Sequence, residues 1–207
     1  MTDTTTKRLW FMDWHGWVLD HNLARDFFSR HPFQPGSYPG LSIIVPSDFT
    51  LPTEVTFKKQ ISMPRAFPLL TMGDAGENLV FFKNEKTNTY MSSSPHEKSR
   101  EITLDSPNCA GWEYFLPLSE NLLRGISSLL VPSALTIVDS ASQSVLSTLK
   151  IHDGFIGQLS ETSFALNENL EALEKIGSLP AGSSTEITFL KHQSHEPWIL
   201  NISRPLA

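Results

Sequence analysis

Bulky apolar residues alternate with polar ones along much of the chain, and this period of two predicts β-strands. The pattern is clearest in residues 8–21, RLWFMDWHGWVLDH, where it continues on both sides of His15 and Gly16. Because glycine adopts positive φ angles easily, Gly16 suits a tight turn. The segment therefore predicts a hairpin with strands at 8–14 and 17–20, stabilised by aromatic pairs across the strands.

Further strands are predicted in the rest of the chain by the same reasoning. They are short apolar or alternating runs, and residues typical of turns lie between them. The expected strands are 41–45, 53–60, 78–83, 89–92, 101–104, 111–116, 134–138, 144–150, 155–159, 163–166, 185–190 and 198–203. Residues 73–76, GDAG, are expected to form a turn.

A few segments instead have apolar residues at the one-face spacing of an α-helix. The first is 21–30, with Asp20 as its N-cap and Pro32 beyond its end. The second follows Ser119 as N-cap and ends before Pro132.

A third helix is predicted at 168–176, with Asn167 as N-cap and Gly177 as C-cap. Gly125 lies inside the second helix. It is expected to weaken that helix by about 1 kcal/mol relative to alanine, because glycine loses more backbone entropy on folding.

These elements predict an α+β fold that is mainly β. The expected architecture is a single domain of antiparallel sheet or barrel type with about three short helices, and 207 residues suit one sizeable domain. Residues 1–7 are polar and are expected to form a disordered tail, so that 8–207 make up the single β-rich domain.

A β-trefoil with insertions is the alternative fold. The three hairpin candidates begin near Leu9, Leu79 and Leu135, and each is later followed by a short strand with a Phe–Leu pattern. Residues 90–92 together with 111–115, GWEYF, are similar to the way in which fascin-like trefoil repeats close. That resemblance implies three equivalent hairpin-plus-strand units.

Charge narrows the choice of partner. The formal net charge is −6, and no cluster of Lys and Arg provides the basic surface that phosphate binding needs, so nucleic acid is not expected as a partner. The longest apolar runs are too short to span a bilayer, and the first residues lack the apolar core of a signal peptide. We expect no membrane association and a cytoplasmic location.

Motifs for catalysis or metal binding are weak. Cys109 is the only cysteine and is expected to be a small buried hydrophobe rather than a nucleophile. His192, His195 and Glu196 resemble a scrambled metalloprotease motif, but they lie between two predicted strands and not on a helix, so a solvated turn is expected. No catalytic residue, metal ligand or cofactor is predicted, and binding is favoured over enzymatic activity.

The candidate site is the first hairpin, which contains three of the five tryptophans and several polar residues. The predicted binding residues are Trp10, Asp13, Trp14, His15, Trp17, Asp20 and His21. In one interpretation the tryptophans belong to the core and the Asp and His side chains face water. In another, aromatic and polar groups line a ligand pocket or bind a metal. A surface aromatic patch that docks a partner lies between these two interpretations.

The favoured hypothesis is an intracellular, non-enzymatic binding protein that recognises another protein, of inhibitor, immunity or adaptor type. An acidic surface would speed its encounter with a basic partner. The first alternative is a β-trefoil-like domain that binds a sugar or small ligand. The second is a small enzyme with an Asp/His site built from Asp13, His15, Asp20 and His21. The sequence leaves the oligomeric state open.

Overall fold

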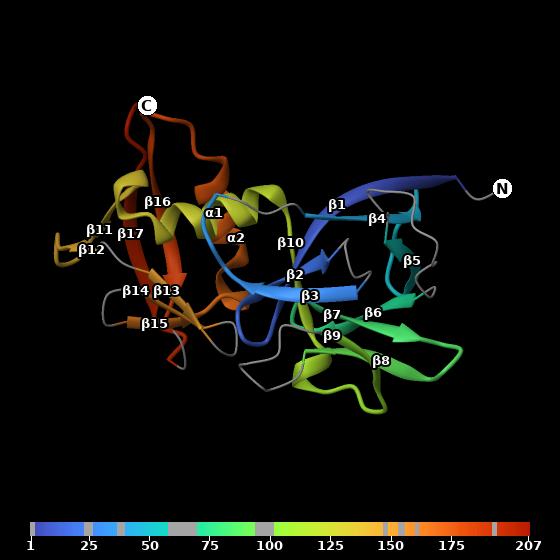
Figure 1. Ribbon diagram of the computed structural model, residues 1–207. Helices are drawn as coiled ribbons and strands as arrows, with labels where there is room; N and C mark the ends of the chain where they lie inside the picture. The colour runs from blue at the N-terminus through green and yellow to red at the C-terminus, as the bar shows by residue number, and fades with distance from the viewer. Residues whose placement is uncertain are drawn as a thin grey trace. The chain divides into compact units, whose positions relative to one another are not determined.

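The computed structural model describes residues 3–22, 27–36, 40–57, 70–93, 102–146, 149–152, 156–159, 162–191 and 194–207 (Figure 1). The chain divides into two compact units. The N-terminal unit consists of Met1–Pro32 and Tyr38–Leu118, and the C-terminal unit of Phe33–Ser37 and Ser119–Ala207. That residues 8–207 form one domain stays a prediction, because compactness alone does not establish whether a unit folds independently.

Antiparallel strands make up most of the N-terminal unit. Its elements are β1 (Thr4–Asp13), β2 (Trp17–Asn22), β3 (Phe27–Pro32), β4 (Leu41–Pro46), β5 (Thr53–Phe57), β6 (Leu70–Gly76), β7 (Leu79–Asn84), β8 (Thr89–Ser93), β9 (Ile102–Ser106), the short 3₁₀ helix η1 (Gly111–Glu113) and β10 (Phe115–Leu118). The strands pair in the order β3-β2-β1-β4-β5-β6-β7-β8-β9, and β10 pairs with both β1 and β7. Since β10 joins two strands that are far apart in this order, the sheet curves back on itself.

Aromatic side chains fill the inside of this curved sheet. Phe11, Phe57, Phe82 and Phe115 are all buried and belong to one core cluster. The rings of Phe11 and Phe82 meet edge to face, with centroids 5.1 Å apart. Such pairs add about 0.5–1.5 kcal/mol beyond the burial of their area. The alternation seen in the sequence therefore places large residues of several strands into a common core.

The first strand is longer than expected. β1 begins at Thr4, and residues 4–9 pair with β4, from Thr4 opposite Pro46 to Leu9 opposite Leu41. Residues 4–7, expected to belong to a disordered tail, are thus strand residues. The β-branched threonines at this end favour strand geometry, and the main-chain pairing with β4 fixes it.

The helix predicted at 21–30 is wrong. The chain instead forms a second hairpin, in which β2 pairs with β3 and Val18 lies opposite His31. Phe28 is buried against Phe57, with ring centroids 4.8 Å apart, and Arg30 is buried on the same strand. The pairing with β2 and the burial of Phe28, Ser29 and Arg30 outweigh a helical spacing that rested on few residues.

The turn expected at 73–76 lies slightly further along the chain. β6 continues to Gly76, and the turn residues are Glu77 and Asn78, whose φ angles are 52° and 64°. Gly73 remains a strand residue and lies opposite Phe81 of β7. The ring of Phe81 covers Gly73, so a side chain at position 73 would collide with that ring.

In its described residues, the C-terminal unit combines two α-helices with two small sheets. Its elements are α1 (Glu120–Leu130), η2 (Pro132–Ala134), β11 (Thr136–Asp139), β12 (Val145–Leu146), β13 (Leu149–His152), β14 (Ile156–Leu159), β15 (Thr162–Ala165), η3 (Asn167–Asn169), α2 (Leu170–Ser178), β16 (Ser184–Leu190) and β17 (Pro197–Ser203). One sheet has the order β12-β11-β17-β16 and the other β13-β14-β15.

The helices of this unit pack at close range. Ser119 caps α1 as expected, because its Oγ accepts a hydrogen bond from the Leu122 amide at 3.1 Å. The prediction of Gly177 as a C-cap is wrong, since α2 runs through it to Ser178. A Cβ atom on Gly177 would lie 1.8 Å from the carbonyl oxygen of Asn121, so this glycine lets the two backbones approach.

The predicted fold class is confirmed: the chain is mainly β, with antiparallel sheets and two α-helices in the described residues. The β-trefoil alternative is wrong. Its three units would have to be equivalent, but the hairpin β1–β2 belongs to the large curved sheet whereas β11–β12 belongs to a separate sheet of four strands.

Candidate binding surface on the first hairpin

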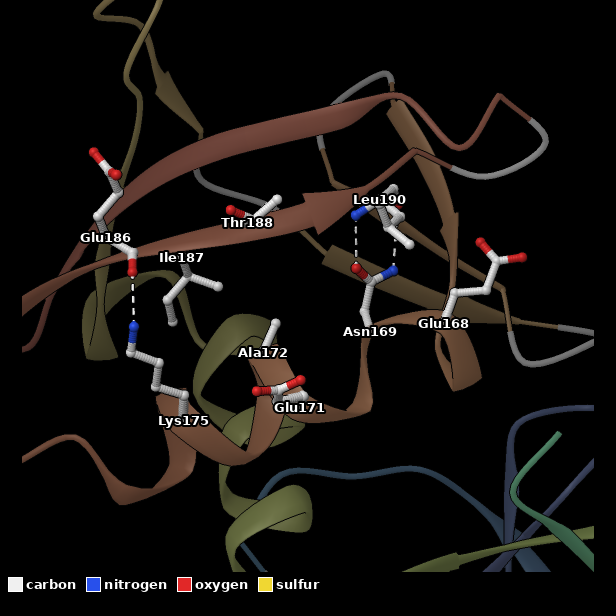
Figure 2. A pocket seen from close by; sticks show the side chains of 9 residues that line it. All are labelled: Glu168, Asn169, Glu171, Ala172, Lys175, Glu186, Ile187, Thr188 and Leu190. Carbon is white, nitrogen blue, oxygen red and sulfur yellow. Dashed lines mark hydrogen bonds between the residues drawn. The ribbon is translucent and has the colours of Figure 1, made fainter.

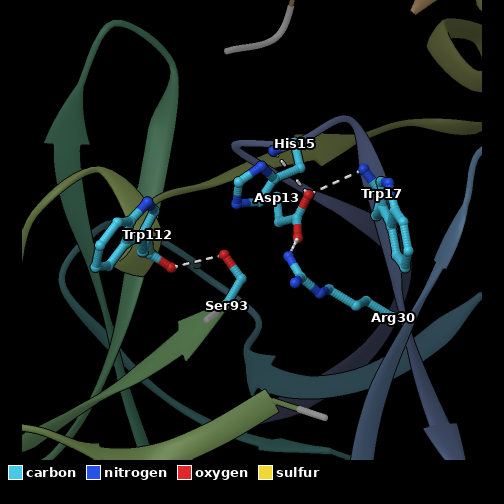
Figure 3. Close-up of polar contacts among 6 residues, drawn as sticks. All are labelled: Asp13, His15, Trp17, Arg30, Ser93 and Trp112. Atoms are coloured by element: carbon cyan, nitrogen blue, oxygen red, sulfur yellow. Dashed lines mark hydrogen bonds and ion pairs between the residues drawn. The ribbon is translucent and has the colours of Figure 1, made fainter. Parts of the chain in front are cut away.

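The turn between β1 and β2 is held by the carboxylate of Asp13 (Figure 3). Its Oδ1 accepts hydrogen bonds from the amides of His15 at 3.0 Å and Trp17 at 2.9 Å. Gly16 has a φ of 77° and donates its amide to the Asp13 carbonyl at 3.0 Å. The hairpin and turn are therefore those predicted from sequence, and one side chain fixes the backbone of the turn.

The other carboxylate oxygen of Asp13 binds Arg30. Arg30 Nη1 lies 2.6 Å from Asp13 Oδ2, and the side chains are only 2% and 1% exposed. The guanidinium also lies over the ring of Trp17, 5.1 Å from its centroid. The expectation that Asp13 faces water is wrong, because a buried arginine requires a buried carboxylate beside it.

Two tryptophans are exposed on this part of the N-terminal unit. Trp14, in the turn, is 38% exposed, and Trp112, in η1, is 46% exposed. The segments that carry them adjoin, since a side-chain carbon on Gly111, the residue before Trp112, would lie 3.9 Å from the ring of Trp14. We call Trp14 and Trp112 the aromatic patch.

Both halves of the aromatic patch stand on a fixed backbone. Trp14 lies in the turn that Asp13 holds, and the carbonyl of Trp112 accepts a hydrogen bond from the buried Ser93 hydroxyl at 2.9 Å (Figure 3). The buried carboxylate of Glu113 accepts a hydrogen bond from the Ala110 amide at 2.9 Å. The backbone therefore has little conformational freedom left to lose when a partner binds.

The other predicted site residues lie elsewhere or support the turn. Trp10 is buried, with the guanidinium of Arg8 over its ring. Asp20 is half-buried and lies 3.3 Å from Nε2 of His31. The side chain of His21 lies outside the described residues. The structure thus brings together Asp13, Trp14, His15 and Trp17 in and beside one turn.

Sequence reasoning missed two important residues, Trp112 and Arg30. Trp112 was expected inside a strand at 111–116, whereas β10 begins only at Phe115. The run of turn residues before it, SPNCAG at 106–111, is the signal that could have placed Trp112 at the end of a loop. No local signal marks Arg30. Its partner Asp13 lies on β1, which is separated from β3 in the sheet by β2.

Of the groups considered for catalysis, the structure describes Cys109, His195 and Glu196. Partial burial and the nearby Glu113 carboxylate raise the pKa of the Cys109 thiol, which disfavours the reactive thiolate. His195 and Glu196 are exposed, and Glu196 is paired with Lys191; His192 lies outside the described residues. Among the residues that the structure describes, no group of three or more His, Cys, Asp or Glu could hold a metal ion.

Comparisons with protein-family models, with curated proteins and with solved structures found no match for this chain. In the described part of the chain no helix is long and apolar enough to cross a membrane. What the fold and the site define is a mainly β protein in which the first hairpin and the short helix η1 each present a partly exposed tryptophan.

Proposed function

We propose that this chain is a non-enzymatic binding protein that recognises another protein through the aromatic patch. Inhibitor, immunity and adaptor proteins are the types that fit. The observation that carries the proposal is the partial exposure of two tryptophans on adjoining segments, 38% for Trp14 and 46% for Trp112, on a backbone that buried polar groups hold in place.

Tryptophan is the residue type in which binding energy at protein interfaces is most often concentrated. Leaving part of two indole surfaces in water has no benefit for folding, because burying the rest of each ring would stabilise the chain further. Exposed apolar residues that form a patch on a well-ordered backbone are typical of interaction sites. The net charge of −6 adds an electrostatic attraction toward basic partners.

The Asp/His enzyme alternative has less support. Asp13 would have to act as a base or ligand, but both of its oxygens are occupied by Arg30 and by two main-chain amides. Asp20 is already 3.3 Å from His31. A cytoplasmic location stays a prediction.

The test is affinity capture with two patch variants, Trp14→Ala and Trp112→Ala. The immobilised chain is incubated with lysate of the source cells, and any stoichiometric partner is identified by mass spectrometry and titrated. We expect each variant to weaken binding by about 10- to 100-fold, as for a truncated hot-spot residue. The free energy of unfolding of each variant is measured alongside, because both side chains are more than half buried and their truncation also removes packing.

Ile199→Ala is the matched control, since Ile199 is also an exposed apolar residue but lies on β17 of the other unit. Equal affinity of both patch variants and the control, or the lack of any stoichiometric partner, would contradict the proposal. Exposed indoles also stack on sugars, so a glycan array is run in parallel. A glycan signal that Trp14→Ala abolishes would replace the protein partner by a carbohydrate.

A further inference from the structure

Strand β16 forms one edge of the four-stranded sheet in the C-terminal unit. Leu190 pairs with Pro197, and the next residue, Lys191, donates its amide to the Glu196 carbonyl at 3.0 Å. In an antiparallel ladder, alternate residues bond to the neighbouring strand and the others point away from it. The amides and carbonyls of Glu186, Thr188 and Leu190 therefore point to the open side of the sheet.

Side chains from the helical segment occupy both ends of this open edge (Figure 2). The buried Asn169 uses its amide as a neighbouring strand would use its backbone: its Oδ1 accepts from the Leu190 amide at 2.8 Å, and its Nδ2 donates to the Leu190 carbonyl at 3.3 Å. Lys175 Nζ donates to the carbonyl of Glu186 at 3.0 Å.

Thr188 lies between these two occupied positions. No residue in the described ranges is hydrogen-bonded to its outward amide or carbonyl, and its side chain is exposed. The residue borders a hollow of about 370 Å³ between α2 and β16 (Figure 2). Thr188 is thus an unpaired residue on a strand edge beside an open hollow, and such a residue can pair with the backbone of an extended peptide.

The lining of the hollow indicates the chemistry of that peptide. Three glutamates, Glu168, Glu171 and Glu186, are among its lining residues, against one lysine, Lys175; the carboxylate of Glu186 points away from α2 (Figure 2). The charge of Lys175 is already directed to the Glu186 carbonyl. A lysine or arginine side chain in the hollow would complement this excess of negative charge.

We propose that β16 binds an extended segment of a partner protein that contains Lys or Arg. The segment adds a fifth strand whose backbone bonds to Thr188, and its basic side chain enters the hollow beside Glu168 and Glu171. The proposal does not rest on the aromatic patch, since it is carried by residues of the C-terminal unit alone.

Two probe peptides test it with the full-length, ¹⁵N-labelled chain. One has the sequence Thr-Lys-Val-Lys-Val-Lys-Thr, and the other has Glu in place of each Lys. The lysine peptide is expected to shift the amide resonances of Thr188 and Glu186 saturably and to slow hydrogen exchange of the Thr188 amide at least tenfold, because that amide becomes bonded. The glutamate peptide should do neither.

Two variants separate backbone pairing from charge. Thr188→Pro removes the outward amide but no bond to β17, because that amide points away from the ladder. It should weaken binding of the lysine peptide about tenfold. The combined variant Glu168→Gln, Glu171→Gln and Glu186→Gln should also weaken it several-fold and reduce its dependence on salt.

The control for charge is Glu54→Gln, Glu77→Gln and Glu120→Gln, which removes three exposed carboxylates elsewhere. If Thr188→Pro does not fold, exchange at Thr188 in the unmodified chain and the Gln variants still decide the question. Binding without protection of Thr188, or equal loss in the control, would overturn the proposal. Trp14→Ala should bind the peptide normally, so failure of one proposal is distinguishable from failure of the other.

Discussion

At the scale of single residues, Asp13 shows how one side chain can organise a surface without belonging to it. Its carboxylate bonds to two amides of the turn and to the buried Arg30. The exposed ring of Trp14 is carried on that turn. The sequence predicted the hairpin and its glycine, because these depend on neighbouring residues. It did not predict the burial of Asp13, because the partner that makes burial possible is 17 residues away.

The first prediction concerns this ion pair. Asp13→Asn should lower the free energy of unfolding by about 3–5 kcal/mol, since it leaves the guanidinium of Arg30 buried without a counter-charge. Urea denaturation followed by tryptophan fluorescence measures the change. Asp20→Asn is the control: its pair with His31 is partly exposed and should contribute less than about 1 kcal/mol. Similar losses in the two variants would show that the buried pair has no special role.

At the scale of elements, local signals predicted most strands and two of the helices. The serine cap of α1 was found because Ser119 and the residues after it form a local pattern. Gly125 was interpreted only as a weakness of α1. In the structure a Cβ on Gly125 would lie 2.0 Å from the Leu173 carbonyl oxygen of α2, so the glycine is required by packing. Helix packing of this kind depends on a distant element and leaves no local pattern.

The second prediction follows from this crossing. Gly125→Ala and Gly177→Ala should each lower the free energy of unfolding by about 1–3 kcal/mol or more, because the added methyl group meets backbone that cannot move aside. The loss should appear although alanine is the better helix former by about 1 kcal/mol. Asn121→Ala, on an exposed position of α1, should leave stability unchanged or raise it slightly. Stabilisation by either glycine variant would contradict the close packing.

At the scale of the whole molecule, the sequence predicted a mainly β, antiparallel chain but not the order of its strands. β1 pairs with β4 along residues 4–9 and with β10 along residues 10–13. These two partner strands lie far apart in the chain. Any strand with the same alternation of apolar and polar residues could pair with β1. Strand alternation therefore predicts which residues face the core and not which strand lies next to which.

A third prediction concerns cooperativity. Residues 33–37 group with the C-terminal unit although the chain before and after them belongs to the N-terminal unit. Since neither unit is one continuous stretch, we expect a single unfolding transition. Asp13→Asn and Gly125→Ala, which change different units, should both lower its midpoint. Two transitions, each moved by only one of these variants, would show two independently folding domains.

The occupied ends of β16 have a consequence for the alignment of anything that docks there. A strand added to an open edge can normally slide by two residues and keep its hydrogen-bond pattern. Here Asn169 fills the position at Leu190, and Lys175 takes the carbonyl at Glu186. An added strand therefore has one alignment, centred on Thr188. The same two side chains shorten the edge along which copies of the chain could stack into a fibre.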